Sequence, residues 1–275
     1  MSFEIEDGET FGLLGPKGSG KTTLFGMLAG FVCPTQGTCS INGKIPGAAQ
    51  EGIIRFMGCL PERLSLPEDM TAVAYLRFVA ELRGIRNLER ALQVMEHFEI
   101  DPDIRIEKIR KGQRRMLALA CALVHHPRVL LLDEPDRNLD PMLQARLDSL
   151  LLEEKARGTT MLITSENYTD MERVCDRIGL LRRGSLVNID DAASMRISRM
   201  KTYLVTFKSE MEALRFLKEN PEMKQISANQ VMMQVRGEIL PCLQLLGKYQ
   251  VAGFEMMTQS LEDIFGHFYG GGTHA

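Results

Sequence analysis

The sequence lacks any apolar run close to the roughly 20 residues that a helix needs to cross a bilayer. The longest apolar candidate covers only residues 116–124. The N-terminal residues, MSFEIEDGET, are acidic and do not have the pattern of a signal peptide. The sequence therefore predicts no membrane span, and work at a membrane would require another chain to supply the membrane part.

The chain also lacks a disulfide framework and an excess of basic residues. Its six cysteines form no CxxC pair, which favours reduced thiols in a cytosolic protein over a secreted scaffold. The formal net charge of −3 argues against a nucleic-acid partner and leaves any basic function to a local patch. The cysteines are Cys33, Cys39, Cys59, Cys121, Cys175 and Cys242.

What is present is typical of a globular α/β protein. The 275 residues, 44% hydrophobic and 25% charged, suffice for one ordinary domain and a small second one. Residues 1–190 alternate short apolar runs with amphipathic stretches, and buried parallel strands are predicted at 11–14, 128–133 and 160–164. Between the last two, Asp140 as N-cap and Pro141 at the first helical position predict a helix that Gly158 ends.

A smaller second unit is predicted beyond residue 190. The pattern loosens over 188–200, and we place a linker at 191–200. Within 201–271 we expect a strand at 202–207, a helix from Ser209, strands near Gln225 and at 231–235, a helix near Leu240 and a strand at 254–257. Two βαβ-like halves of this size predict a ferredoxin-like α+β domain. Ser209 and Glu212 fit a capping box.

The motif GPKGSGKT at residues 15–22 predicts a phosphate-binding loop, because a strand precedes it and a helix follows it. The glycines let backbone N–H groups converge on phosphate oxygens. Lys21 would reach the β- and γ-phosphates, and the Thr22 hydroxyl would bind Mg²⁺. An ordinary glycine-rich turn is the alternative, and this context disfavours it. The candidate nucleotide ligands of the loop are Gly15, Pro16, Lys17, Gly18, Ser19, Gly20, Lys21, Thr22 and Thr23.

The run RVLLLDEPD supplies the acidic partners of that loop. Asp133, at the end of an apolar strand, is placed to hold Mg²⁺ directly or through water. Glu134 follows at once and could deprotonate an attacking water, which makes it the candidate catalytic residue. A pair of solvated carboxylates at a strand end is the alternative, and the phosphate loop makes it the weaker one.

The stretch KIRKGQRRMLALACALV, residues 108–124, reads as a helix whose cations lie at the wrong end. A helix N-terminus already bears a partial positive charge, so cations are unfavourable there unless an anion lies among them. The pattern therefore predicts an anion at this helix start. The cations are Lys108, Arg110, Lys111, Arg114 and Arg115.

Together these motifs resemble the ATP-binding subunits of ABC transporters, over nearly the whole chain. GLLGPKGSGKTTL is similar to the family's phosphate loop, RVLLLDEPDRNLDP to its Mg²⁺ and base strand with the dimer-contacting loop at Asp140, and IRKGQRRMLALACALVHHP to its signature helix. The ending SLEDIFGHFYG (260–270) resembles accessory domains of the branch with drug, polysaccharide and heme-type exporters. The resemblance implies a P-loop NTPase fold, and the anion would be ATP held by a second subunit.

The chain departs from the family at its signature and at the loop that follows the second strand. Arg110 replaces the signature serine and Lys111 its first glycine, while Gly112 and Gln113 remain. Arg110 would either serve the same phosphate oxygen as a cation or remain in solvent. Glu62 stands where the family carries a Mg²⁺-contacting glutamine, and a carboxylate is an acceptable ligand there.

The most serious departure is Ser165, which stands where the family has a histidine that holds the γ-phosphate. Loss of such a contact commonly lowers a rate about 10²–10³-fold, so hydrolysis is expected to be slow. The family's first strand, with its adenine-stacking aromatic residue, is not found before Phe3. We hypothesise a misplaced start, and sequencing of the in-frame upstream DNA would test it.

The resemblance implies an ATP hydrolase that energises export through an integral membrane permease, by ATP-driven closure of a homo- or heterodimer with Mg²⁺ as cofactor. Such a subunit would be cytoplasmic and peripheral on the inner face of the membrane, with permease helices docked near LRFVAELRG (76–84). The alternative is an ATP-sensing regulatory module that hydrolyses little. A DNA-repair or translation protein is disfavoured, because neither a coiled-coil insertion nor a tandem domain is found.

Overall fold

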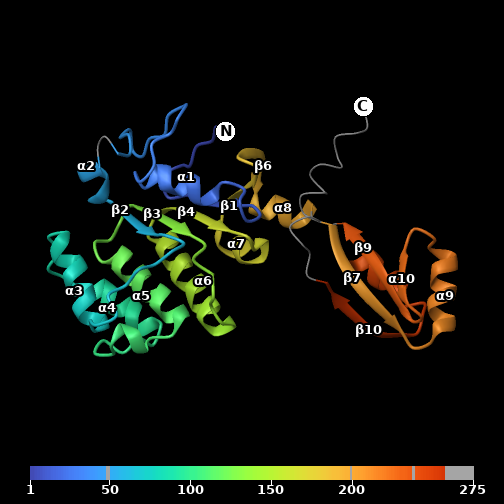
Figure 1. Ribbon diagram of the computed structural model, residues 1–275. Coiled ribbons are helices and arrows are strands. Elements are labelled where there is room, and N and C mark those ends of the chain that lie inside the picture. The colour runs from blue at the N-terminus through green and yellow to red at the C-terminus, as the bar shows by residue number, and fades with distance from the viewer. Residues whose placement is uncertain (48–49, 199, 237–238, 258–275) are drawn as a thin grey trace. The chain divides into compact units, whose positions relative to one another are not determined.

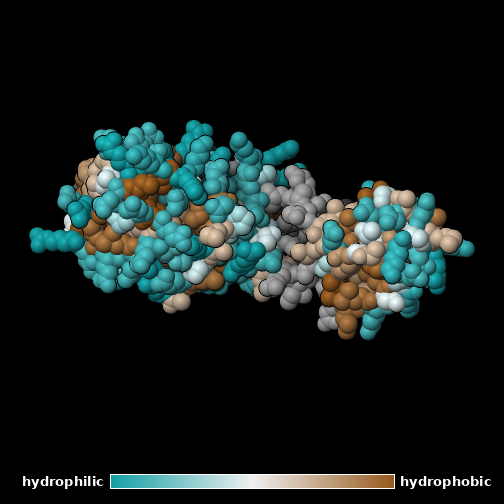
Figure 2. All heavy atoms as spheres, turned by 90° about the horizontal axis from the view of Figure 1, so that it is seen from below, coloured by the Kyte–Doolittle hydropathy of each residue, from teal (hydrophilic) through white to brown (hydrophobic). Residues whose placement is uncertain are grey.

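The computed structural model describes residues 1–47, 50–198, 200–236 and 239–257. The chain divides into two compact units, Met1–Ala192 and Ala193–Ala275. The similarity noted at 260–270 lies outside the described residues. On the face seen in Figure 2, hydrophilic residues cover most of the first unit, whereas hydrophilic and apolar areas lie side by side on the second.

The first unit is built on a mostly parallel sheet, as predicted. Its strands lie in the order β2-β3-β4-β1-β5-β6, and only β6 runs antiparallel to its neighbour. The order places the first strand of the chain in the middle of the sheet, between β4 and β5. The strands are β1 (Thr10–Leu14), β2 (Met57–Leu60), β3 (Val129–Asp133), β4 (Thr160–Ser165), β5 (Arg177–Arg182) and β6 (Ser185–Asp191).

Helices cover both faces of this sheet, with α1 on one side and α5 and α6 on the other (Figure 1). Phe11 and Leu13 of β1, Leu131 of β3 and Leu162 of β4 pack with Phe25 of α1 in a buried cluster. The helices of the unit are α1 (Lys21–Leu28), α2 (Gln50–Ile54), α3 (Ala72–Leu82), α4 (Glu89–His97), the 3-10 helix η1 (Ile106–Lys108), α5 (Lys111–Leu123), α6 (Pro141–Ala156) and α7 (Tyr168–Val174).

The helix predicted after residue 140 is confirmed in detail. The Asp140 carboxylate accepts the backbone N–H groups of Met142 and Leu143, and Pro141 occupies the first turn of α6. Gly158 follows the helix with a φ of +82°, a conformation that glycine adopts without strain. The signature helix differs at its start, because α5 begins at Lys111 and Arg110 is its extended N-cap.

The second unit has the element order β7-α9-β8-β9-α10-β10, the β-α-β-β-α-β order expected from the sequence. Its antiparallel sheet has the strand order β10-β7-β9-β8. Val205, Phe207 and Val231 of the sheet pack against Phe216 of α9 and Leu246 of α10. The elements are β7 (Met200–Phe207), α9 (Glu210–Glu219), β8 (Lys224–Ser227), β9 (Gln230–Arg236), α10 (Leu240–Leu246) and β10 (Val251–Met256).

Two predictions made for this part of the chain need correction. Within the predicted linker, residues 191–198 form regular structure: β6 extends to Asp191, and α8 spans Ala192–Ser198. The capping box forms only in part. The Ser209 hydroxyl accepts the Glu212 N–H as predicted, but the Glu212 carboxylate accepts the backbone N–H of Gln250. That carboxylate ties α9 to the segment before β10.

Candidate nucleotide site

The carboxyl ends of the central parallel strands bring the phosphate loop, Asp133, Glu134 and Ser165 to one edge of the sheet. Leu14 of β1 pairs with Ser165 of β4, and Asp133 of β3 pairs with Thr164 of β4. The phosphate loop leaves β1 at this edge, where the Gly15 N–H donates to the Ser165 carbonyl at 3.3 Å. In open parallel sheets ligands bind at this edge, so the topology supports the predicted location.

The phosphate loop requires glycine for two physical reasons. A Cβ on Gly15 would lie 2.4 Å from the Leu181 carbonyl oxygen and 2.6 Å from Ser19 Oγ. Gly18 and Gly20 have φ values of +78° and +110°. Gly20 is also the N-cap of α1 and offers no capping side chain. The first N–H groups of α1 thus remain suited to an anion.

The remaining loop residues divide into exposed and buried ones. Lys17, Thr22 and Thr23 are exposed, while Ser19 is buried, and its N–H donates to the Pro16 carbonyl at 3.1 Å. Among the described residues the Ser19 hydroxyl has no hydrogen-bond partner. Lys17 is therefore exposed within the loop, and Thr22 and Thr23 are exposed in the first turn of α1.

Lys21 is the first residue of α1, and its side chain is only 5% exposed. Its ammonium donates to the Gly15 carbonyl at 2.6 Å and to the Pro16 carbonyl at 3.3 Å. The same nitrogen lies 3.1 Å from Glu134 Oε1 and 3.6 Å from Glu166 Oε1. The lysine is thus held between the loop backbone and two carboxylates that follow β3 and β4.

Glu134 has a backbone geometry that fixes its position. Its φ is +51°, an unusual value for a residue other than glycine, and its N–H donates to both the carbonyl and the hydroxyl of Thr164, each at 3.1 Å. Burial raises the pKa of Glu134, and the charge of Lys21 works in the opposite direction. A carboxylate with these properties suits proton abstraction.

Asp133 is fully buried at the end of β3. Its Oδ1 accepts the Thr164 hydroxyl at 2.5 Å, whereas among the described residues its Oδ2 has no hydrogen-bond partner. A buried carboxylate oxygen without a partner is costly unless a cation or a water binds it. The side chain therefore fits a hard cation such as Mg²⁺, bound directly or through water.

Two of the three predicted metal ligands lie in contact. The Thr22 hydroxyl donates to Glu62 Oε2 at 3.4 Å, and Glu62 also forms an ion pair with Arg137. In the described part of the chain, three or more His, Cys, Asp or Glu side chains do not gather into a cluster fit for a metal. Any Mg²⁺ here would need oxygen ligands from the nucleotide besides Thr22, Glu62 and Asp133, which is usual for this ion.

The basic helix start is explained in part by contacts within the chain. Arg115 is buried and donates to the Glu62 carbonyl at 2.9 Å, to the Pro61 carbonyl at 3.4 Å and to the Asp133 carbonyl. Burial lowers the pKa of Arg115, although the neighbouring carboxylates oppose that shift. Arg114 binds Glu68 at 2.9 Å. Arg115 thus joins the end of β3 to the loop after β2, and Arg114 joins the start of α5 to the loop that contains Glu68; the sequence pattern revealed neither contact.

The other signature residues contact segments other than their own phosphate loop or lie exposed. Arg110 and Lys111 are exposed, and a Cβ on Gly112 would meet Leu143 Cδ1 at 3.0 Å and the Asn138 carbonyl oxygen at 3.2 Å. Gln113 donates to the Glu99 carbonyl at 3.2 Å. Within the described residues, no hydrogen bond or ion pair joins these four residues or Asp140 to residues 15–23.

Ser165 lies at the edge as predicted, but it bonds to a carboxylate. It is buried, its hydroxyl donates to Asp136 Oδ2 at 2.7 Å, and it accepts the Asn167 N–H at 2.9 Å. Burial raises the pKa of Asp136, and the bond from Ser165 opposes that shift. Sequence reasoning missed Asp136, Glu166 and Arg137, whose only signal was that each lies within three residues of a predicted site residue.

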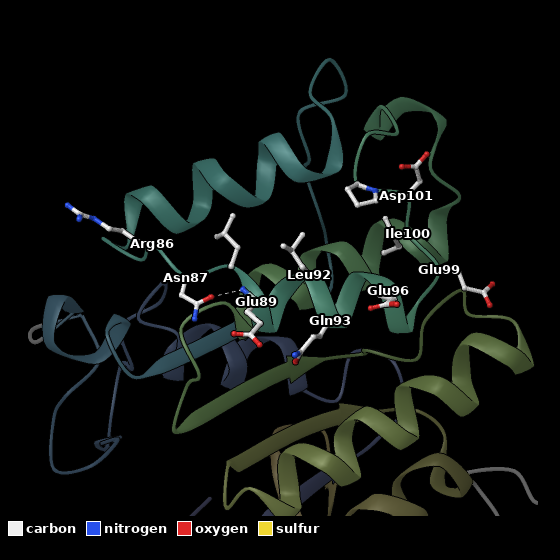
Figure 3. A pocket seen from close by; sticks show the side chains of 11 residues that line it. Arg86, Asn87, Glu89, Leu92, Gln93, Glu96, Glu99, Ile100 and Asp101 are labelled. Carbon is white, nitrogen blue, oxygen red and sulfur yellow. Dashed lines mark hydrogen bonds between the residues drawn. The ribbon is translucent and has the colours of Figure 1, made fainter.

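A broad groove of about 1010 Å³ lies apart from these residues, along α4 and the loop that precedes it (Figure 3). Glu89, Glu96, Glu99 and Asp101 give its rim an acidic character, while Leu92 and Ile100 provide apolar surface. Because its lining runs from Arg86 to Pro102, the groove shares no residue with the nucleotide site.

Comparison with known proteins defines the class. The family model described as ABC transporter matches residues 1–137. The uncharacterized ABC transporter ATP-binding protein YhcH of Bacillus subtilis is 30% identical over 271 residues, which cover 96% of this chain and 88% of YhcH. The chain therefore belongs to the family of ABC transporter ATP-binding proteins.

Two further matches cover a smaller part of the chain. The Nod factor export ATP-binding protein I of Sinorhizobium fredii is 36% identical over 194 residues, and the match spans 67% of this chain but 55% of that relative. A solved structure described as an ATP binding subunit of an ABC transporter is 27% identical, with a TM-score of 0.65, over 70% of this chain and 83% of that one. Both alignments cover only about two thirds of the present chain.

Proposed function

We propose that this chain is the ATPase subunit of an exporter, which it energises through a separate membrane permease by ATP-driven closure of two ATP-binding subunits. The observation that carries the proposal is the position of Lys21. Its ammonium is held at the mouth of the phosphate loop, 3.1 Å from the candidate base Glu134. A triphosphate bound at the N-terminus of α1 would therefore meet a cation and a base together.

Residues 15–23 would hold the phosphates through backbone N–H groups and Lys21. Thr22, Glu62 and Asp133 would hold Mg²⁺, and the unpartnered oxygen of Asp133 supports that assignment. The ion would neutralise phosphate charge when bound. Glu134 would orient a water and take its proton as the oxygen attacks the γ-phosphorus, so that the products are ADP and phosphate.

The second subunit would complete the site. Arg110 and Lys111 are exposed at the N-terminus of α5, where the helix dipole and two cations favour an anion. The chain carries both halves of a composite site, a phosphate loop with its base and a basic signature face. We therefore take a second copy of this chain as the partner. Asp140 and Gln113 would lie at the same dimer interface.

A permease would anchor the protein on the inner face of the membrane. No helix in the described residues has the length and apolar character needed to cross a bilayer. On α3, within the segment expected to dock the permease, Phe78 and Leu82 are 48% and 72% exposed. Exposed apolar side chains of this size are consistent with a partner surface. The unit after residue 200 would act as an accessory domain.

An ATP-sensing module with little hydrolysis is the second candidate. The observation that favours it is the engagement of Ser165 with Asp136, which puts a hydroxyl and a carboxylate where the family has an imidazole. Neither group carries a positive charge that could stabilise a γ-phosphate. Such a protein would close on ATP and reopen slowly.

Phosphate release distinguishes the two candidates. The protein, co-purified with its membrane partner, is assayed with MgATP beside a Glu134→Gln variant. Steady release that the variant loses supports the exporter ATPase. Release equally low in both proteins, together with intact ATP binding, supports the sensor. If neither protein binds ATP, both functions are excluded.

A further inference from the structure

Glu166 follows Ser165 directly, and its carboxylate lies beside the phosphate-loop lysine. Glu166 Oε1 is 3.6 Å from Lys21 Nζ, on the same nitrogen that Glu134 contacts at 3.1 Å. The two glutamates differ in exposure: the Glu166 side chain is 48% exposed, whereas that of Glu134 is 13% exposed. One buried ammonium therefore faces two carboxylates, and only one of them is readily reached by solvent.

Lys21 Nζ thus lies within 3.6 Å of two negatively charged side chains, Glu134 and Glu166. A polyphosphate that enters the loop brings further negative charge, and it can bind Lys21 only by replacing carboxylate contacts.

The two glutamates differ in how easily they can leave the lysine. Glu134 is tied to β4 by two hydrogen bonds from its backbone N–H to Thr164. Glu166 lies between β4 and α7 (Tyr168–Val174), and only its carboxylate reaches Lys21. A half-exposed side chain can turn into solvent at small cost.

We propose that Glu166 is a positioning residue that competes with nucleotide phosphate for the Lys21 ammonium and so lowers the affinity of this site for ATP. The inference rests on the proposed role of Lys21 as a phosphate ligand. Glu166 acts on ATP through the lysine and through its own negative charge. It weakens nucleotide binding without taking part in the transfer of the proton.

Equilibrium binding of MgATP to the full chain tests this role. Glu166→Gln removes the charge and keeps the shape, so the dissociation constant should fall about two- to fivefold, the range for a half-exposed charge pair. Glu166→Asp keeps the charge and should stay close to the unaltered protein. Glu96→Gln, on the groove of Figure 3, is the matched control and should change nothing. Added salt should reduce the difference in dissociation constant between Glu166→Gln and the unaltered protein.

The inference is overturned if Glu166→Gln binds MgATP no more tightly than the unaltered protein. It is equally overturned if Glu96→Gln gives the same tightening, or if the gain persists undiminished in high salt. Lys21→Ala is measured in parallel to separate two failures. If Lys21→Ala leaves ATP binding intact, the proposed phosphate site itself is wrong. If only Lys21→Ala has the expected effect, the error lies with Glu166 alone.

Discussion

The molecule has two groups of charged residues that differ in how completely they are paired within the chain. The phosphate-loop edge comprises Lys21, Asp133 and Glu134, and the Arg110 face comprises Arg110 and Lys111. At the edge, Lys21 has carbonyl and carboxylate partners, and Asp133 is held by Thr164. At the face, Arg110 and Lys111 are exposed at the start of α5, and the helix has no side-chain cap. The difference is what the proposed function requires, in which the phosphate-loop edge is built within one subunit and Arg110 and Lys111 meet the nucleotide of a second subunit.

The largest effect is expected from Glu134→Gln, which removes the base from the edge. Turnover of ATP should fall about 10²–10⁴-fold, because proton abstraction in the transition state is lost. Affinity for ATP should not weaken, because a negative charge beside Lys21 disappears. Phosphate release and equilibrium binding measure the two quantities. Unchanged turnover would remove Glu134 from the catalytic role.

Lys21→Ala removes the ammonium group from the phosphate-loop edge. The loss of a charge-assisted phosphate contact, worth about 1.5–3 kcal/mol, should weaken ATP binding roughly ten- to a hundredfold. Isothermal titration with MgATP measures it, and a thermal melt without nucleotide checks that the variant folds. An unaltered dissociation constant would contradict the assignment.

Arg110→Ala tests whether the Arg110 face contributes to the dimer. The variant is made in a Glu134→Gln background, where slow hydrolysis keeps the dimer closed. The closed dimer should weaken by about 1–3 kcal/mol, or roughly five- to a hundredfold, while each subunit binds ATP as before. Sedimentation with and without MgATP measures the dimer. Lys108→Ala, an exposed cation just before α5, is the control. Equal dimerisation of all three proteins at low salt would show that Arg110 is a solvated surface residue.

Among these four changes, Ser165→His should have the smallest effect, a gain in turnover of up to about tenfold at saturating ATP with little effect on affinity. The imidazole would have to share the buried position with Asp136, which limits the gain. Ser165→Ala serves as the control and should not accelerate phosphate release. The absence of any gain from histidine would strengthen the sensor interpretation.

The sequence was sufficient wherever the chemistry is local. The phosphate loop was predictable because its glycines have positions set by steric contacts and by positive φ, and the Asp140 cap because it serves the two following N–H groups. The order of elements in the second unit followed in the same way from alternating patterns.

The contacts that the sequence did not predict join residues that are far apart along the chain. Arg115 looked like one more cation of a basic helix start, yet it is buried against carbonyls that follow β2 and end β3. Glu212 was assigned to its own helix cap, but its carboxylate accepts the backbone N–H of Gln250. Neither set of contacts could be predicted from spacing, because the contacts join residues that are 18 to 53 positions apart in the sequence.

The central claim, that two copies share each ATP site, is tested most directly by mixing two damaged proteins. Lys21→Ala damages the phosphate loop, and Arg110→Ala damages the signature face. A mixed dimer has one site with both defects and one intact site. We predict that phosphate release by the mixture, with the permease present, exceeds the sum for the two variants assayed separately. A mixture that only equals that sum would contradict the claim.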